Sequence, residues 1–197
     1  MPPTTPARDR LLGAAASLFY GAGITATGVD RIAAEAGVSK PTLYAHFPSK
    51  AVLVSAVLVE RHDRQRASLQ AHLAESDQSP IDRLLGVFDW LGAWHASEAT
   101  RGCAFLNAAA ELTDQTDPAR RVIAQHKRWL RDQLALLSSE AGLVNPEEVG
   151  EELLLLVEGA NTRMLVEGDL GAAPRARRAA DAVIEAAQPA RSGADGE

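Results

Sequence analysis

The fold of this chain is decided by residues 28–50, which read GVDRIAAEAGVSKPTLYAHFPSK. In the first half, apolar or small residues recur at helical spacing, which predicts a short helix over 29–36 with Thr27 or Gly28 as its cap and Gly37 after its end. Ser39 is a capping residue and Pro41 falls in a first helical turn, so a second short helix is predicted up to Phe47. Two short helices joined by such a turn form a helix-turn-helix unit, whose second helix is free to enter a DNA major groove.

The sequence outside this unit also carries helix signals. A stripe of apolar residues predicts a helix over 7–22, and Ser49 caps a long helix over 50–76. Three pairs of a capping residue and a proline predict the starts of longer helices, of about 18–25 residues each: Ser79-Pro80, Asp117-Pro118 and Asn145-Pro146. Shorter helices are predicted over 102–112 and 174–188. Since no strand pattern or repeat is present, we predict an all-α fold.

The predicted domains follow from these elements. Residues 1–48 form an N-terminal three-helix helix-turn-helix DNA-binding domain, and residues 49–188 form a C-terminal helical domain for effector binding and dimerisation. Residues 189–197 contain too little apolar surface to pack, so we expect a disordered tail.

Charge and composition exclude several classes of protein. The chain has a net charge of −6, yet residues 1–55 hold five basic and three acidic residues, so the remainder carries −8. A mildly basic head on an acidic body is typical of a localised DNA footprint. The single cysteine, Cys103, excludes an intrachain disulfide. No apolar run reaches the ~18 residues of a membrane span and the N-terminus lacks a signal-peptide core, so we expect a cytoplasmic protein.

Residues 28–50 closely resemble the signature of the TetR family of bacterial transcriptional regulators. The most specific part is the ending LYAHFPSK, residues 43–50. The resemblance covers residues 8–60, and beyond them the chain is similar to the family only in its helix pattern. It implies an all-helical homodimer whose first three helices bind DNA.

Carried over to this chain, the resemblance places the recognition helix over 39–47. The implied DNA-binding residues are Thr27, Arg31, Ser39, Lys40, Pro41, Thr42, Tyr44, His46 and Lys50. Lys40 is able to donate to a guanine edge, and Thr42 to reach a base or a phosphate. Leu43 and Phe47 are predicted to be core residues. Ala45 stands where some relatives carry a large aromatic residue, so no base preference is transferred there.

A dimer surface is expected because one helix-turn-helix reads too few base pairs, whereas a dimer reads two half-sites of a palindrome. The segment 147–168 is apolar over a wide arc, and 174–188 carries a narrow stripe of mostly small residues. The predicted interface residues are Leu153, Leu156, Val157, Ala160, Met164, Ala176, Ala180, Val183 and Ile184. The alternative is that these residues are ordinary core within one chain.

The remaining helices are predicted to enclose a ligand pocket with an apolar lining and a few polar groups. The predicted pocket residues are Phe88, Leu91, Trp94, His95, Phe105, Leu106, Asn107, Glu111, His126, Trp129 and Asn161. The alternative for either histidine is a core residue with its hydrogen bonds satisfied, and for Cys103 a small buried apolar residue rather than a redox sensor.

These features predict a sequence-specific DNA-binding regulator, a repressor released from a palindromic operator by a small, largely apolar ligand. The alternative is an effector-independent DNA-binding regulator with a filled helical core. An enzyme is disfavoured because no nucleophile elbow, phosphate loop or metal-spaced His/Glu cluster occurs, so no catalytic residue, cofactor or metal is expected. The expected partners are double-stranded DNA, a second copy of the chain and an unknown small-molecule effector, and no membrane.

Overall fold

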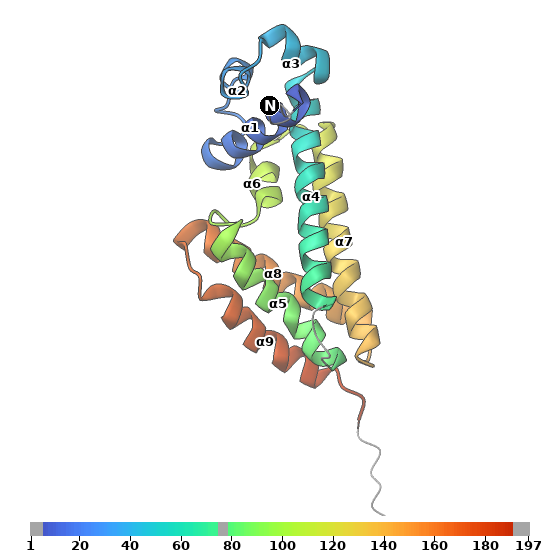
Figure 1. Ribbon diagram of the computed structural model, residues 1–197. Helices are drawn as coiled ribbons and strands as arrows, with labels where there is room; N and C mark the ends of the chain where they lie inside the picture. The colour runs from blue at the N-terminus through green and yellow to red at the C-terminus, as the bar shows by residue number, and fades with distance from the viewer. Residues whose placement is uncertain (1–5, 75–78, 191–197) are drawn as a thin grey trace, which may run out of the picture. The chain divides into compact units, whose positions relative to one another are not determined.

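The computed structural model describes residues 6–74 and 79–190, and within these ranges it contains nine helices and no strand (Figure 1). The helices are α1 (Ala7–Ala22), α2 (Val29–Glu35), α3 (Lys40–His46), α4 (Lys50–Ala74), α5 (Pro80–Ser97), α6 (Ala104–Glu111), α7 (Pro118–Glu140), α8 (Pro146–Glu167) and α9 (Ala172–Ala186). The predicted all-α fold is confirmed. The tail was expected to be disordered, and its residues from 191 onward lie outside the described ranges.

The three predicted cap-proline starts all open helices, by two different means. The Ser79 hydroxyl accepts the Asp82 N–H at 3.2 Å, and the Asp117 carboxylate accepts the Ala119 N–H at 2.8 Å. Asn145 instead adopts the left-handed region at φ 53° and makes no side-chain cap to the backbone. At this third start, therefore, Pro146 favours the helix through its fixed φ, while Asn145 supplies no side-chain cap.

The chain forms two compact units. The first comprises the described residues up to Ala67 together with Cys103–His126, and the second comprises Ser68–Gly102 and the described residues from Lys127 onward. Helices α4 and α7 therefore contribute residues to both units, whereas α6 belongs to the first unit alone. The predicted boundary after residue 48 stays a prediction.

The first unit has its own apolar core. Helix α1 buries the stripe that starts at Leu11 and Ala15, while α2 and α3 contribute Ile32 and Leu43, and all four side chains are fully buried. Truncating such a leucine to alanine typically costs about 2–5 kcal/mol. Packing of this order, rather than intrinsic helix propensity, holds helices as short as α2 and α3.

The second unit packs α5, α8 and α9 side by side, with part of α7 against α8 (Figure 1). Phe88, Leu153 and Ile184 are fully buried between them. Gly150 lets α8 approach α7 closely, since a Cβ there would lie 2.8 Å from the backbone nitrogen of Ala135.

Within the described parts of the chain, no single helix is long and apolar enough to cross a membrane. Among the described helices, α3 and α4 taken together reach the length and apolar composition of a membrane span, but the two are bent by 63° relative to each other.

Candidate nucleic-acid interface and ligand site

The turn between α2 and α3 is built by local hydrogen bonds. Gly37 lies in the left-handed region at φ 62°, and its N–H donates to Ala34 O at 3.1 Å. Such a φ is easy for glycine and strained for most other residues. The Ser39 hydroxyl accepts the Thr42 N–H at 3.2 Å, which caps α3, and Arg10 of α1 donates to Ala36 O at 3.0 Å. The predicted helix-turn-helix is therefore present, with its two helices fixed to α1.

One face of α3 is exposed while the other is anchored in the core. Leu43 and Phe47 are buried, as predicted. The remaining predicted DNA-binding residues of this segment lie at or near the surface: Ser39, Lys40, Pro41, Tyr44 and His46 are exposed, and Thr42 and Lys50 are half-buried. Arg31 on α2 is exposed as well. Tyr44 keeps 41% of its surface exposed, so its ring is accessible to a binding partner.

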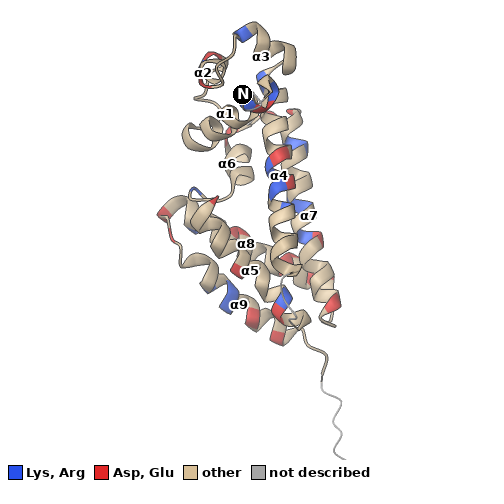
Figure 2. Cartoon of the chain, viewed as in Figure 1, with Lys and Arg blue, Asp and Glu red and all other residues tan. Residues whose placement is uncertain are grey.

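Charges on the two helices interact at the start of α3. In Figure 2 the ribbon is blue, for a basic residue, near this start and partly red, for acidic residues, on α2. The Lys40 ammonium lies 2.9 Å from the Asp30 carboxylate, and the hydrogen bond to Asp30 raises the pKa of Lys40. Because both side chains are exposed, this ion pair contributes little to stability and is easily exchanged for a phosphate or base contact.

Thr27 differs from its predicted role. Its side chain is fully buried, and its hydroxyl donates to Gly23 O at 2.7 Å. A buried hydroxyl that is already bonded does not reach a DNA phosphate, so the phosphate contact predicted for Thr27 is not supported. Its role is to fix the loop that joins α1 to α2.

The predicted pocket residues fall into two groups, one in each unit. In the second unit lie Phe88, Leu91, Trp94, His95 and Asn161, all buried, and the half-buried Trp129. In the first unit lie the buried Phe105 and His126 and the half-buried Leu106, Asn107 and Glu111. The sequence stripes therefore identified buried faces correctly, but not the fact that these faces belong to separate cores.

A buried polar pair joins α5 to α8 in the second unit. His95 is fully buried, and its Nε2 lies 3.0 Å from Asn161 Oδ1. Burial lowers the pKa of His95, against the opposing effect of the bond to Asn161. A neutral ring that donates from Nε2 presents Nδ1 as an acceptor, and among the described residues Nδ1 has no hydrogen-bond partner.

The lowered pKa of His95 predicts a pH-dependent stability. In the unfolded chain a histidine titrates near pH ~6.5, whereas in the fold His95 stays neutral to lower pH. We therefore expect the free energy of unfolding to be constant above pH ~6.5 and to fall below it, by about 1.4 kcal/mol per pH unit for this one group. Urea unfolding at several pH values below ~6.5 measures how the free energy of unfolding changes with pH. In His95→Gln we expect this pH dependence to be smaller, by an amount that corresponds to about one proton taken up on unfolding. The exposed His46→Gln is the control, and an unchanged slope in His95→Gln would contradict the assignment.

The first unit contains a buried pair of histidines, His62 and His126. His62 and His126 approach with their Nδ1 atoms 3.1 Å apart, and Phe105 stacks on His126 at 3.7 Å between ring centroids. Burial lowers the pKa of His62. In the described residues no group of three or more His, Cys, Asp or Glu side chains is arranged to hold a metal ion.

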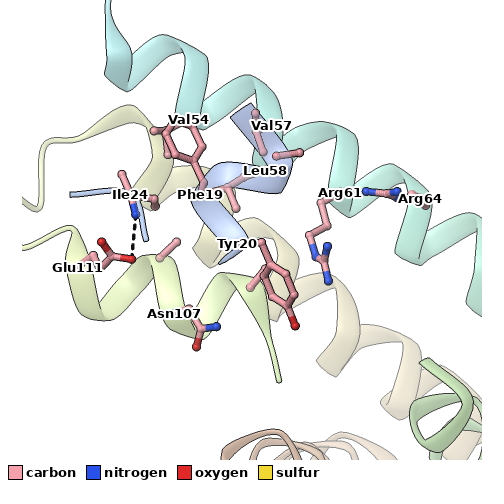
Figure 3. A pocket seen from close by; sticks show the side chains of 13 residues that line it. Phe19, Tyr20, Ile24, Val54, Val57, Leu58, Arg61, Arg64, Asn107 and Glu111 are labelled. Carbon is pink, nitrogen blue, oxygen red and sulfur yellow. Dashed lines mark hydrogen bonds between the residues drawn. The ribbon is translucent and has the colours of Figure 1, made fainter. Parts of the chain in front are cut away.

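A small cavity lies between α1, α4 and α6 of the first unit (Figure 3). Its volume is about 40 Å³, and of the predicted pocket residues only Asn107 and Glu111 line it. Sequence reasoning missed the contributions of Tyr20, Arg61 and Arg64. The signal for Arg61 was present, because it continues the helical stripe of Val54, Val57 and Leu58, but an arginine was not expected at the edge of an apolar face.

The predicted dimer residues lie mostly inside the second unit. Of the nine, only Leu156 and Val183 are half-buried, and the others are buried within the chain. A neighbouring stripe on α8 is exposed instead, with Leu155 and Val166 each 72% exposed. Together with small residues of α9, including Ala176 and Ala179, Leu155 lines an open groove.

Comparison with known proteins gives consistent results. Residues 11–57 match the model of the bacterial regulatory proteins of the tetR family, and residues 80–180 match a tetracyclin repressor-like C-terminal domain. A TetR-family transcriptional regulator from Streptomyces coelicolor is 32% identical and superposes with a TM-score of 0.85 over 93% of this chain and 96% of its own.

Two curated relatives differ in the direction of their regulation. The transcriptional repressor DhaR of Mycobacterium sp. (strain GP1) is 25% identical over 83% of this chain and 84% of its own length. The transcriptional activator FasR of Mycolicibacterium smegmatis (strain ATCC 700084 / mc(2)155) is 52% identical, over 30% of this chain and 27% of its own. With the helix-turn-helix in place and both regions matched, the chain belongs to the TetR family of bacterial transcriptional regulators.

Proposed function

We propose that this regulator is a repressor that binds a palindromic operator as a homodimer and leaves it when a small, largely apolar ligand binds. The observation that carries the DNA-binding part is the exposed face of α3, where Lys40 and Tyr44 project from a helix anchored by Leu43. Of the residues predicted to bind DNA, all except Thr27 remain in this proposal.

The open groove along α8 and α9 supports pairing with a second copy of the chain. The exposed leucine and valine on α8 are costly to leave in water, and the small residues of α9 permit close helix approach. A twofold arrangement that pairs this groove with its copy gives a four-helix interface. The interface is thus proposed to include Leu155 and Val166, beside the predicted Leu156 and Val183.

The chemistry of His95 supports one class of effector. Its buried Nδ1 is an acceptor without a partner in the described residues, so an apolar ligand with an O–H or N–H donor would satisfy it. Trp94 and Leu91 are buried neighbours on the same helix. We therefore propose an apolar molecule that carries a single donor, such as an alkylphenol.

One observation favours the alternative of an effector-independent regulator. The cavity between α1, α4 and α6 holds about 40 Å³, whereas ligand pockets usually hold about 300–1,000 Å³. In this state that cavity is too small for a ligand of ordinary size, and a ligand bound beside the fully buried His95 would have to displace packed side chains such as Leu91 and Trp94.

The experiment that tests the proposal is release from an operator duplex obtained by selection from randomised DNA. We expect fluorescence anisotropy to show saturable binding that weakens steeply with salt, and 4-propylphenol to lower the affinity at least about tenfold. The methyl ether of 4-propylphenol, which lacks the donor, is the matched control. Binding of DNA with no response to either compound would favour the effector-independent regulator, and no specific DNA binding at all would overturn the proposal.

A further inference from the structure

The start of α3 carries a cation where a helix favours an anion. Lys40 is the first residue of α3, and no acidic residue lies in the first turn of this helix. The N-terminus of a helix is the positive end of its dipole, so a lysine there is unfavourably placed unless a negative charge lies beside it. That charge comes from another helix, because the Lys40 Nζ lies 2.9 Å from Asp30 Oδ1 and donates to Asp30 Oδ2 at 3.2 Å.

The helix-turn-helix itself sets the position of Asp30. Asp30 lies in the first turn of α2, ten residues before Lys40. The turn between the two helices is closed by the Val38 N–H, which donates to Ala33 O at 3.0 Å, and Arg10 fixes the end of α2 to α1. The side chains of Lys40 and Asp30 remain 49% and 75% exposed. The carboxylate therefore lies on the same open surface as the ammonium, and DNA that reaches Lys40 also meets Asp30.

The carboxylate of Asp30 affects two kinds of DNA contact differently. A lysine ammonium has three N–H donors, and a pair with two carboxylate oxygens leaves at least one donor for DNA. A phosphate oxygen bound by that donor would lie about 5 Å from the Asp30 carboxylate, close enough for the two negative charges to repel each other. A guanine O6 or N7 in the same place carries no full charge. Asp30 therefore opposes a phosphate contact of Lys40 and tolerates a base contact.

We propose that Asp30 is a specificity-determining residue, which keeps the Lys40 ammonium from the phosphates of non-operator DNA and orients it towards a guanine edge in the operator. This inference rests on the proposed contact of Lys40 with the operator. Complexes with non-operator DNA are held by phosphate contacts alone, so the carboxylate weakens them most. Specificity is a difference between two affinities, and a group that repels the wrong partner increases it.

The ion pair is tested in the free protein by NMR titration of the lysine side chains, of which the chain has three. The hydrogen bond and the charge of Asp30 raise the pKa of Lys40. We expect Asp30→Asn to lower this pKa towards its ordinary value. Glu35→Gln removes another exposed carboxylate, at the opposite end of α2, and is expected to leave the pKa unchanged. The same pKa of Lys40 in the wild-type and Asp30→Asn proteins would overturn the proposal before any DNA is added.

The effect on specificity is tested by anisotropy titrations of the full-length protein against the selected operator and a scrambled duplex at several salt concentrations. We expect Asp30→Asn to bind the scrambled duplex about tenfold more tightly, with a salt slope steeper by about one for each protomer, because Lys40 then neutralises a phosphate. The operator affinity is expected to change by less than about threefold. Glu35→Gln is again the matched control, and it should change the two affinities equally. An equal gain on both duplexes in Asp30→Asn would overturn the proposal.

The dependence on Lys40 is tested by the double variant Asp30→Asn/Lys40→Ala. Without the ammonium the carboxylate has no cation to hold. We therefore expect Asp30→Asn to strengthen binding of the scrambled duplex in the Lys40→Ala protein by no more than Glu35→Gln does. A full tenfold gain there would show general repulsion of DNA by Asp30 and would contradict the proposal. Failure of the wild-type protein to select any operator would overturn the DNA-binding function together with this role, whereas equal gains on both duplexes would overturn the role of Asp30 alone.

Discussion

Replacing Tyr44 by alanine is expected to weaken operator binding by about ten- to a hundredfold, which corresponds to about 1–3 kcal/mol for a residue at the base edges. Tyr44 is the large residue on the exposed face of α3, and the packing of α3 rests on Leu43 and Phe47 instead. Thermal stability should therefore stay near that of the wild-type protein. Anisotropy titrations against the operator and against a scrambled duplex measure both specific and non-specific affinity.

Comparison with Lys40→Ala separates recognition of bases from attraction to the backbone. The Lys40 ammonium forms only an exposed ion pair with Asp30, so its removal costs little stability. If Lys40 contacts a phosphate, its loss weakens all duplexes alike and reduces the salt slope by about one, whereas loss of Tyr44 acts mainly on the operator. Arg178→Ala, at an exposed position on α9, is the control. Full operator affinity in both Tyr44→Ala and Lys40→Ala would show that α3 does not read DNA.

Replacing Leu155 by glutamate is expected to convert the dimer to a monomer and to reduce operator affinity by at least about a hundredfold. Leu155 is 72% exposed in the single chain, so a charge there costs the fold little. In the proposed dimer the same charge would be buried against its own copy, which is strongly unfavourable. A single half-site then supplies the remaining affinity. Sedimentation velocity gives the assembly state, and anisotropy gives the affinity.

Leu136→Glu provides the control for this prediction, because Leu136 is also exposed, at 51%, but lines a different groove between α7 and α8. We expect Leu136→Glu to remain dimeric and to bind the operator normally. A dimeric Leu155→Glu protein, or dissociation of the Leu136→Glu protein instead, would refute an interface along α8 and α9.

The helix-turn-helix was predictable because its determinants are local. The cap by Ser39, the left-handed Gly37 and the periodic apolar residues all act within a few positions of one another, and each is present in the structure. The same holds for the helix starts at Ser79 and Asp117.

Features that depend on distant contacts were not predictable from the residues. The burial of Thr27 follows from the path of the loop after α1, and the hydrogen bond from the Ile24 N–H to the Glu111 carboxylate joins residues 87 positions apart. The stripe at Leu153 on α8 was correctly identified as apolar, yet it packs within the chain, while Leu155, on another face of the helix, is exposed. Periodicity identifies an apolar face but does not name the surface that covers it.

The most direct test of the account is selection of bound sequences from a randomised duplex library, with the wild-type protein and Tyr44→Ala compared in parallel. We expect the wild-type protein to enrich a twofold-symmetric sequence whose half-sites lie about one helical turn, 34–36 Å, or a multiple apart, and Tyr44→Ala to lose it. No enrichment by the wild-type protein, together with no salt-dependent binding, would contradict the central claim that α3 reads an operator.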